Sequence, residues 1–309
     1  MIISVLIFAS FHIAKIPYAL TLEISDEDEI SSGVFLQAPV DALYWQDRLF
    51  VLDSKGYRVI STKQGTHKII GKRGKGPGEF ANEPVMFCVE NHQLKVFEWN
   101  FHQVSYFDFE GAFISRSVPQ VKGLYPNQIH LLSLNFEQRL ELGFNFQFPS
   151  GCFFDSLEER TLQGEHLNRS ILARSNSGEI IIGKQRGWIG LVASDCQITH
   201  QMPLGLQKFA GEPKPMASTY VTYEGKLTPM LENGLPLIGL AAASSEQVWA
   251  LVRDERTETR WLYEINLIAK QVRYKAELDQ SMDRIRYSQG MLILLSEEEA
   301  IVQAYQIKP

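Results

Sequence analysis

The sequence predicts an all-β protein, and three observations support this prediction. Short runs of β-branched, aromatic and other apolar residues recur along the chain, and Gly, Asn, Asp or Ser bound each run. Apolar residues at helical spacing over three successive turns are lacking. The strand-like runs repeat at intervals of 40–46 residues, with one longer interval, and this period is typical of four-stranded propeller blades. The sequence therefore predicts a six-bladed β-propeller with four-stranded antiparallel blades.

The six predicted units can be aligned on their strongest apolar runs. These runs begin at Leu49, Leu94, Leu140, Ile180, Val248 and Met291. The long interval before the fifth run contains an insertion at about 203–236 that is rich in Gly, Pro and Met. An insertion of this kind on a rigid scaffold could act as a lid, as a partner surface or as an ordinary packed excursion. We expect residues 20–309 to form a single domain.

The N-terminal segment has a predicted role in this arrangement. The last unit, residues 282–309, has room for only about three strands. Residues 21–24 (TLEI) alternate polar and apolar side chains, as a half-buried strand does. We expect this strand to complete the last blade and so to close the ring, which removes the open sheet edges. The acidic run at 26–29 that follows is interpreted as a solvated turn.

Residues 1–19 resemble a signal peptide in part. An apolar stretch covers residues 2–11, and Ala19 is the best residue for cleavage to follow. A basic segment before the apolar stretch is missing, and Pro17 stands where a small residue is preferred. A misassigned start or a buried N-terminal strand are the alternatives. The prediction is an exported protein, periplasmic or extracellular, with a cytoplasmic location as the other option and no internal membrane span.

Composition excludes several classes of protein. The 309 residues are 45% hydrophobic and 21% charged, which is typical of a globular chain that can bury a core. The formal net charge of −6 argues against a surface built for nucleic acid, and we expect no specific nucleic acid partner. The three cysteines and seven histidines show no metal-binding spacing.

One motif carries a family resemblance. Residues 49–60 read LFVLDSKGYRVI, and residues 71–80 read GKRGKGPGEF. Over residues 40–119 the chain resembles NHL-repeat and TolB-like six-bladed propeller proteins, in which a strand ends in Asp, a turn with Arg follows, and a Gly-rich loop leads to the next blade. Asp53 is expected to accept hydrogen bonds from backbone amides of its turn and to pair with Arg58. Phe80 is expected to fill the wedge between neighbouring blades.

The Gly-rich loop also allows a functional interpretation. Lys72, Arg73 and Lys75 are cationic, and Gly-rich backbone segments can bind anions. The spacing is not that of a nucleotide-binding loop, so the primary prediction is a connection between blades. A basic patch for an anionic polymer is compatible with that connection.

Ligand-binding candidates follow from the register of the innermost strands. Equivalent positions near the propeller axis fall at Asp41, Met86, Leu132, Ser170, Leu240 and Asp283, with Arg284 beside the last. The polar members, Asp41, Ser170, Asp283 and Arg284, are the predicted ligand-binding residues. The resemblance implies that some relatives hold a metal in the central channel, where a hard cation prefers about six oxygen ligands. Two carboxylates are too few, so no catalytic residue, metal site or cofactor is predicted.

The functional prediction is a non-catalytic propeller that binds a protein, peptide or glycan ligand. The competing prediction is a metal-dependent hydrolase or lyase that uses Ca²⁺ or Zn²⁺ in the channel through Asp41 and Asp283. Both rest on analogy with other proteins of the predicted fold, because one fold hosts many functions.

Overall fold

The computed structural model describes most of the chain. The described residues are 16–31, 33–90, 92–98, 103–117, 161–162, 165–166, 170–175, 178–184, 188–192, 198–209, 214–223, 226–232, 236–254, 256–278 and 281–307. Within them the secondary structure consists of antiparallel strands and one short 3-10 helix, η3 (Leu206–Phe209). In the same residues, no helix has the length and apolar character needed to cross a membrane.

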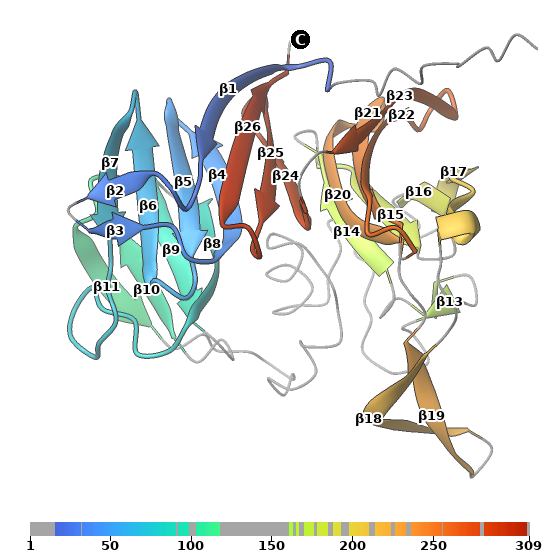
Figure 1. Cartoon of the computed structure of the whole chain (residues 1–309), viewed down its shortest axis with the longest axis horizontal. Helices are drawn as coiled ribbons and strands as arrows, with labels where there is room; N and C mark the ends of the chain where they lie inside the picture. The colour runs from blue at the N-terminus through green and yellow to red at the C-terminus, as the bar shows by residue number, and fades with distance from the viewer. Residues whose placement is uncertain are drawn as a thin grey trace, which may run out of the picture.

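Two four-stranded sheets form the N-terminal part of the described chain (Figure 1). Sheet A contains β4 (Pro39–Trp45), β5 (Arg48–Asp53), β6 (Arg58–Lys63) and β7 (Thr66–Ile70). Sheet B contains β8 (Pro84–Glu90), β9 (Gln93–Glu98), β10 (Val104–Phe107) and β11 (Phe113–Ser117). These sheets coincide with the first two predicted units.

Three further four-stranded sheets follow. Sheet C contains β14 (Ser170–Arg174), β15 (Ile180–Lys184), β16 (Trp188–Val192) and β17 (Ile198–Pro203). Sheet D contains β20 (Leu237–Ser244), β21 (Gln247–Arg253), β22 (Arg260–Asn266) and β23 (Gln271–Leu278). Sheet E contains β24 (Arg284–Ser288), β25 (Met291–Ser296), β26 (Ile301–Gln306) and β1 (Ala19–Ile24).

Three small hairpins accompany the sheets. They are β2 (Glu29–Ser31) with β3 (Val34–Phe35), β12 (Thr161–Leu162) with β13 (Glu165–His166), and β18 (Lys214–Tyr223) with β19 (Lys226–Glu232). The strong run of the third predicted unit, at Leu140, lies outside the described residues. The described part of the chain thus contains five four-stranded sheets.

Tight turns explain why neighbouring strands pair as hairpins. The turns between β4 and β5, β6 and β7, and β24 and β25 each have two residues, and both residues have positive φ. Such turns match the right-handed twist of the flanking strands. The turn residues are Gln46–Asp47, Gln64–Gly65 and Gln289–Gly290.

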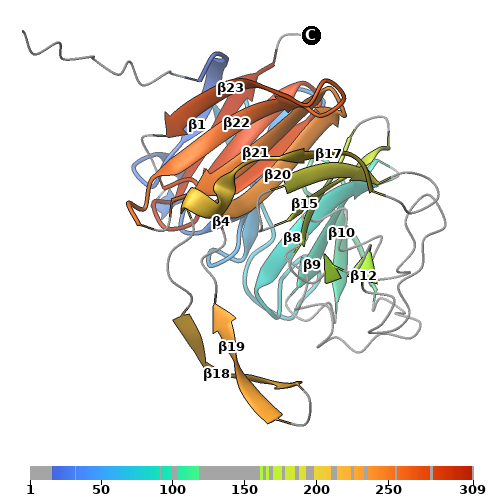
Figure 2. The ribbon, with the colours of Figure 1, turned by 90° about the vertical axis from the view of Figure 1, so that its right-hand side faces the viewer.

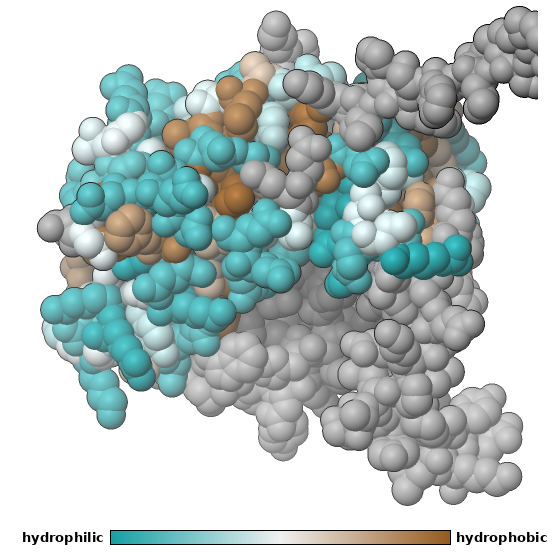
Figure 3. Space-filling view, viewed as in Figure 1, coloured by the Kyte–Doolittle hydropathy of each residue, from teal (hydrophilic) through white to brown (hydrophobic). Residues whose placement is uncertain are grey.

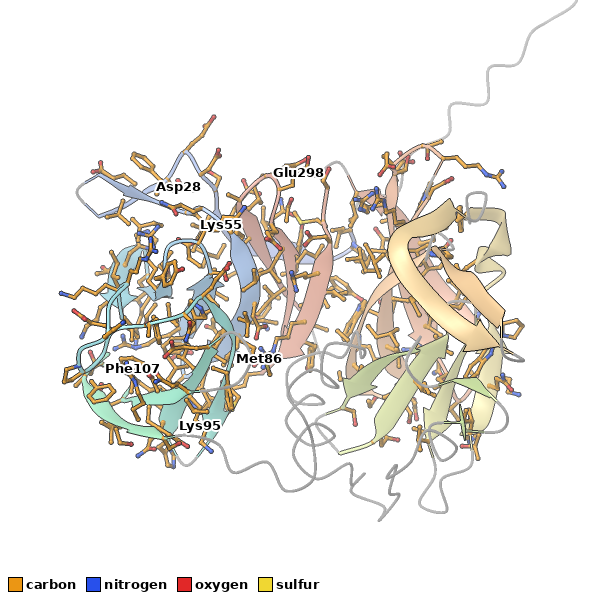
Figure 4. The ribbon with its side chains drawn as sticks, turned by 90° about the horizontal axis from the view of Figure 1, so that it is seen from below. Asp28, Lys55, Met86, Lys95, Phe107 and Glu298 are labelled. Atoms are coloured by element: carbon orange, nitrogen blue, oxygen red, sulfur yellow. The ribbon has the colours of Figure 1, made fainter. Side chains whose placement is uncertain are left out.

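Neighbouring sheets pack in sequence order through their first strands. β4 contacts β8 of sheet B, β20 contacts β14 of sheet C and β24 of sheet E, and β24 also contacts β4. The contacts therefore run from sheet C through D, E and A to sheet B. In Figure 4, Met86 on the first strand of sheet B lies nearer the middle of the molecule than Phe107 and Lys95 do.

Apolar side chains fill the space between these sheets. Phe50 and Phe87 belong to a buried cluster between sheets A and B, and Trp249 and Leu292 belong to one between sheets D and E. Val51 and Ile293 belong to a further cluster between sheets E and A. Burial of such clusters is the main favourable contribution to folding.

The predicted pairing of the chain's first and last strands is present. β1 pairs antiparallel with β26, from Ala19 opposite Gln306 to Ile24 opposite Val302. This makes β1 the fourth strand of sheet E and covers the edge that β26 would otherwise expose. Apolar side chains reach the surface around β1 and β26 in Figure 3, and Leu20 of β1 is 50% exposed.

Asp53 joins the end of β5 to the segment that enters β4. Its Oδ1 accepts hydrogen bonds from the backbone N–H of Ala38 at 2.8 Å and of Gln37 at 3.3 Å, and its Oδ2 accepts one from Arg58 Nε at 2.8 Å. The pairing with Arg58 confirms the sequence prediction. The backbone amides differ from the expected ones, because they precede β4 and do not belong to the turn. A Cβ atom on Gly56 would lie 2.3 Å from Asp53 Oδ2, so the ion pair needs glycine there.

Phe80 lies where the sequence predicted, between the first two sheets. It is fully buried and packs edge-on against Phe107, with 5.8 Å between the ring centroids. Gly71 has a φ of +78°, and a Cβ atom there would lie 2.2 Å from the Phe80 ring. The Gly-rich loop is therefore a connection between blades that leaves room for an aromatic wedge.

The insertion has a packed base and a projecting end. It lies between β17 and β20, and Leu206 and Phe209 of η3 are buried in the cluster between sheets C and D. After η3 the chain forms the β18–β19 hairpin, which extends away from the five sheets in Figure 2.

Replacing Phe80 tests the packing between sheets A and B. We expect Phe80→Ala to lower the free energy of unfolding by about 3–5 kcal/mol, because it leaves a cavity among buried rings. Urea unfolding followed by tryptophan fluorescence measures the change. Phe35→Ala is the control, since Phe35 is 42% exposed, and it should cost much less. A loss below about 1 kcal/mol for Phe80→Ala would contradict the wedge role.

Candidate functional site

The structure places the predicted axis-facing residues on or beside the first strands of their sheets. Leu132 lies outside the described residues. The others are Asp41 in β4, Met86 in β8, Ser170 at the start of β14, Leu240 in β20 and Asp283 immediately before β24. Met86 and Leu240 are buried in apolar clusters, so their side chains do not face a ligand.

Asp41 is held by an arginine of the neighbouring sheet. Its Oδ1 accepts a hydrogen bond from Arg286 Nη1 at 2.7 Å and one from the backbone N–H of Ala42 at 2.9 Å. Both charged side chains are 14% exposed, and the Arg286 guanidinium lies 5.8 Å from the centroid of the Phe87 ring. The pair therefore joins β24, β4 and β8, the first strands of sheets E, A and B.

A second group of predicted residues lies at the start of β24 and in the turn after β25. Arg284 Nη2 donates a hydrogen bond to Glu297 Oε2 at 2.9 Å, whereas its Nε lies 3.9 Å from Asp283 Oδ1. Asp283 Oδ2 accepts a long hydrogen bond of 3.4 Å from the backbone N–H of Glu297. The main partner of Arg284 is thus Glu297, and Asp283 is held loosely.

Sheet D contributes three charged residues next to this group. Arg260 Nη1 donates a hydrogen bond to the backbone carbonyl of Glu258 at 2.5 Å, and Arg253 Nε donates one to Glu258 Oε2 at 2.9 Å. Arg260 is close enough to Asp283 to affect the pKa of its carboxyl. We name the six residues the D/E junction: Arg253, Glu258, Arg260, Asp283, Arg284 and Glu297.

Burial perturbs two members of the D/E junction. Burial raises the pKa of the Asp283 carboxyl, although Arg284 and the Glu297 backbone N–H counteract the effect. Burial also lowers the pKa of Arg260, with a further contribution from the nearby Arg253. Both shifts show that the charged forms lose solvation in the folded protein.

Two buried atoms of the junction lack a hydrogen bond within the described part of the chain. They are Nε of Arg260, a donor whose side chain is 8% exposed, and Oδ1 of Asp283, an acceptor. A buried polar atom without a partner costs about 1–3 kcal/mol. A group that both accepts and donates, such as a hydroxyl or a peptide amide, has the chemistry to satisfy both atoms.

Asp41 and Asp283 do not form one centre. Asp41 bonds to Arg286 between sheets E and A, and Asp283 belongs to the junction of sheets D and E. Ser170 is in sheet C, where its backbone pairs with Lys184. Among the described residues no three His, Cys, Asp or Glu side chains gather as metal ligands. Because arginines also neutralise both carboxylates, these residues do not fit a Ca²⁺ or Zn²⁺ centre.

Two of the three predicted anion-binding cations already have partners. Lys72 Nζ lies 3.2 Å from Glu79 Oε1, and the Arg73 guanidinium lies 5.1 Å from the centroid of the Tyr57 ring. Lys75 is exposed. The Gly-rich loop thus carries its own counter-ion, which weakens its attraction for an anionic polymer.

Glu79 stabilises the shape of this loop. Its carboxylate accepts a hydrogen bond from the backbone N–H of Gly76 at 2.8 Å. That bond, followed by Lys72, lowers the pKa of the Glu79 carboxyl below its ordinary value. The charge of Glu79 therefore has a structural role in the connection between sheets A and B.

Arg286 and Arg260 are the residues that sequence reasoning missed. Arg286 is two positions after Arg284 on β24. Side chains two residues apart on a strand point to the same face of the sheet, so the sequence alone could have indicated that both arginines share a face. Arg260 stands opposite Arg253 in the β21–β22 pair, and no sequence pattern marks that contact.

Comparisons with known proteins concern the fold. No family model and no curated protein matches the sequence. A member of the DUF4221 family from Bacteroides vulgatus is 9% identical with a TM-score of 0.50, and the match covers 94% of this chain and 97% of that one. A catalytically inactive virginiamycin B lyase from Staphylococcus aureus, solved with quinupristin, is 9% identical with a TM-score of 0.43, covering 93% and 99%. The WD40 domain of Neurospora crassa Pan2 is 8% identical with a TM-score of 0.40, covering 94% and 96%.

The packing order of the sheets and the fold similarity to the DUF4221 structure together show a β-propeller. Successive four-stranded antiparallel sheets pack side by side through their first strands, which is the arrangement of propeller blades. The identities are too low for a function to be carried over from these structures.

Replacing Asp283 tests the electrostatics of the D/E junction. Since its pKa is raised in the folded state, protonation favours folding; that contribution is complete at low pH and is lost as pH rises through the folded-state pKa. Asp283→Asn mimics the protonated acid at every pH. We expect the urea midpoint of this variant at pH 7 to equal or exceed that of the native chain. The difference between the two midpoints should become smaller toward pH 3. A clearly lower midpoint at pH 7 would show that the charge of Asp283 is stabilising.

Proposed function

We propose that this propeller is a non-catalytic binding module whose D/E junction contacts a protein, peptide or glycan ligand. The proposal includes six blades closed into a ring, with the third blade built around the run at Leu140. It also includes export to the periplasm or the cell exterior, which the apolar stretch at residues 2–11 supports.

The unpaired atoms of Arg260 and Asp283 carry the proposal. A donor and an acceptor, each buried and without a hydrogen bond within the described residues, belong to this one charged junction. A ligand that offers both an acceptor and a donor relieves the cost of both atoms at once. Sugar hydroxyls and peptide amides have this property.

The surroundings of the junction favour a polar ligand. Glu297 of the junction precedes Glu298 in the turn between β25 and β26. Asp28, Lys55 and Glu298 lie at the same end of the sheets in Figure 4. A surface of charged turns suits hydroxyl and amide groups better than it suits an apolar ligand.

The β18–β19 hairpin supports a macromolecular partner. It projects from the sheets and pairs with no other described strand, so both of its edges are open. Open strand edges bind extended peptide segments by adding a strand.

A hydrolase or lyase mechanism through Asp41 and Asp283 has less support. Asp41 accepts a hydrogen bond from Arg286, whereas Asp283 Oδ1 lies 3.9 Å from Arg284 Nε, so the two carboxylates have different surroundings and different arginine neighbours. General acid–base catalysis requires both groups within reach of the reacting atoms.

Ligand arrays test the proposed site. The full chain is screened on oligosaccharide and peptide arrays, and the dissociation constant of any ligand found is measured by calorimetry. Arg260→Met and Asp283→Asn should each weaken that binding about tenfold or more, because each loses a bond to a charged group. Lys55→Met is the control at the same end of the sheets and should bind normally. Equal affinity in all variants, or no specific retention on either array, would count against the proposal.

A further inference from the structure

The residues that precede β1 contact a different sheet from the one that β1 joins. β1 belongs to sheet E, but Ile16 and Tyr18 pack against the apolar cluster between sheets D and E. The Tyr18 ring meets Trp249 of β21 edge-on, with 6.3 Å between centroids and an angle of 77°. The start of the described chain therefore bridges two blades.

The Tyr18 hydroxyl is part of a partly buried hydrogen-bond chain. It accepts a hydrogen bond from Trp249 Nε1 at 3.1 Å and donates one to Glu264 Oε2. Gln247 Nε2 lies 3.4 Å from Glu264 Oε1 and donates to it. With the phenol in place, Trp249 is fully buried and Glu264 is 8% exposed.

Loss of Tyr18 would remove both hydrogen bonds and side-chain packing. The indole N–H would lose its hydrogen-bond partner, and Glu264 would lose a donor. The ring itself fills space beside Trp249, which also stacks on Tyr287 at 5.2 Å. Removal of Ala19 would further delete the residue that pairs with Gln306 at the end of the β1–β26 ladder.

We propose that Tyr18 belongs to the mature folded protein, so that any removal of the apolar N-terminus occurs before Ile16 and not after Ala19. In such processing a leader-cleaving peptidase adds water across one peptide bond, and the new N-terminus keeps the Tyr18 contacts. The inference is independent of the ligand proposed above, since it concerns only the contacts of residues 16–19.

The native N-terminus gives the direct test. The full-length chain is expressed in a host that exports it, purified in the folded state and sequenced from its N-terminus. A first residue at Ile16 or earlier, including an intact Met1, supports the proposal. A folded protein that lacks Tyr18, with a first residue at Ala19, Leu20 or later, overturns it.

Substitutions in the full chain test the contacts themselves. Tyr18→Phe removes the hydroxyl and Tyr18→Ala also removes the ring, so we expect the urea midpoint to fall by roughly 0.3–0.6 M in the first variant and further in the second. Thr21→Ala is the matched control, because the Thr21 side chain is exposed and its hydroxyl donates to the nearby Ala19 carbonyl. Midpoints and tryptophan fluorescence that are unchanged in both Tyr18 variants would refute the bridging role.

Discussion

The antiparallel pairing of β1 with β26 is the interaction on which the rest of the structure depends. The C-terminal part of the chain supplies only three strands to sheet E, and the fourth comes from the opposite end of the sequence. Sheet E in turn packs against sheets D and A. Two charged clusters involve these contacts: Arg286 of β24 bonds to Asp41 of sheet A, and Asp283, next to β24, is close enough to Arg260 of sheet D to be affected by its charge. Both clusters therefore depend on the position of the β24 end of sheet E.

The segment from Ile16 to Ala38 makes contacts with three blades. Tyr18 bonds to Glu264 in sheet D, β1 lies in sheet E, and the backbone N–H of Ala38 donates to Asp53 in sheet A. One short stretch of chain thus connects the sheets that come last in the sequence to the sheet that comes first. Local opening of sheet E would break contacts with sheets D and A as well, which raises the free energy of that opening.

The sequence predicts contacts within one repeat better than contacts between repeats. The period of the apolar runs located all five described sheets, and the local motif predicted the Asp53–Arg58 pair and the buried Phe80. The partner of Asp41 was not predicted, because it depends on which face of β24 turns toward sheet A. The electrostatic effect of Arg260 on Asp283 was missed for the same reason, since neighbours across two sheets are far apart in sequence. The amides that Asp53 binds were also missed, because they belong to the preceding segment.

The position of β1 beside β26 also brings the two ends of the described chain together. Ala19, the first residue of β1, stands opposite Gln306, the last residue of β26, so the start of β1 lies beside the end of β26. A short linker between Ile307 and Ile16 could therefore join them, and new termini could be opened in a solvent-facing turn such as Gln64–Gly65. The architecture is thus suited to circular permutation, in which the order of the blades along the chain changes while their neighbours stay the same.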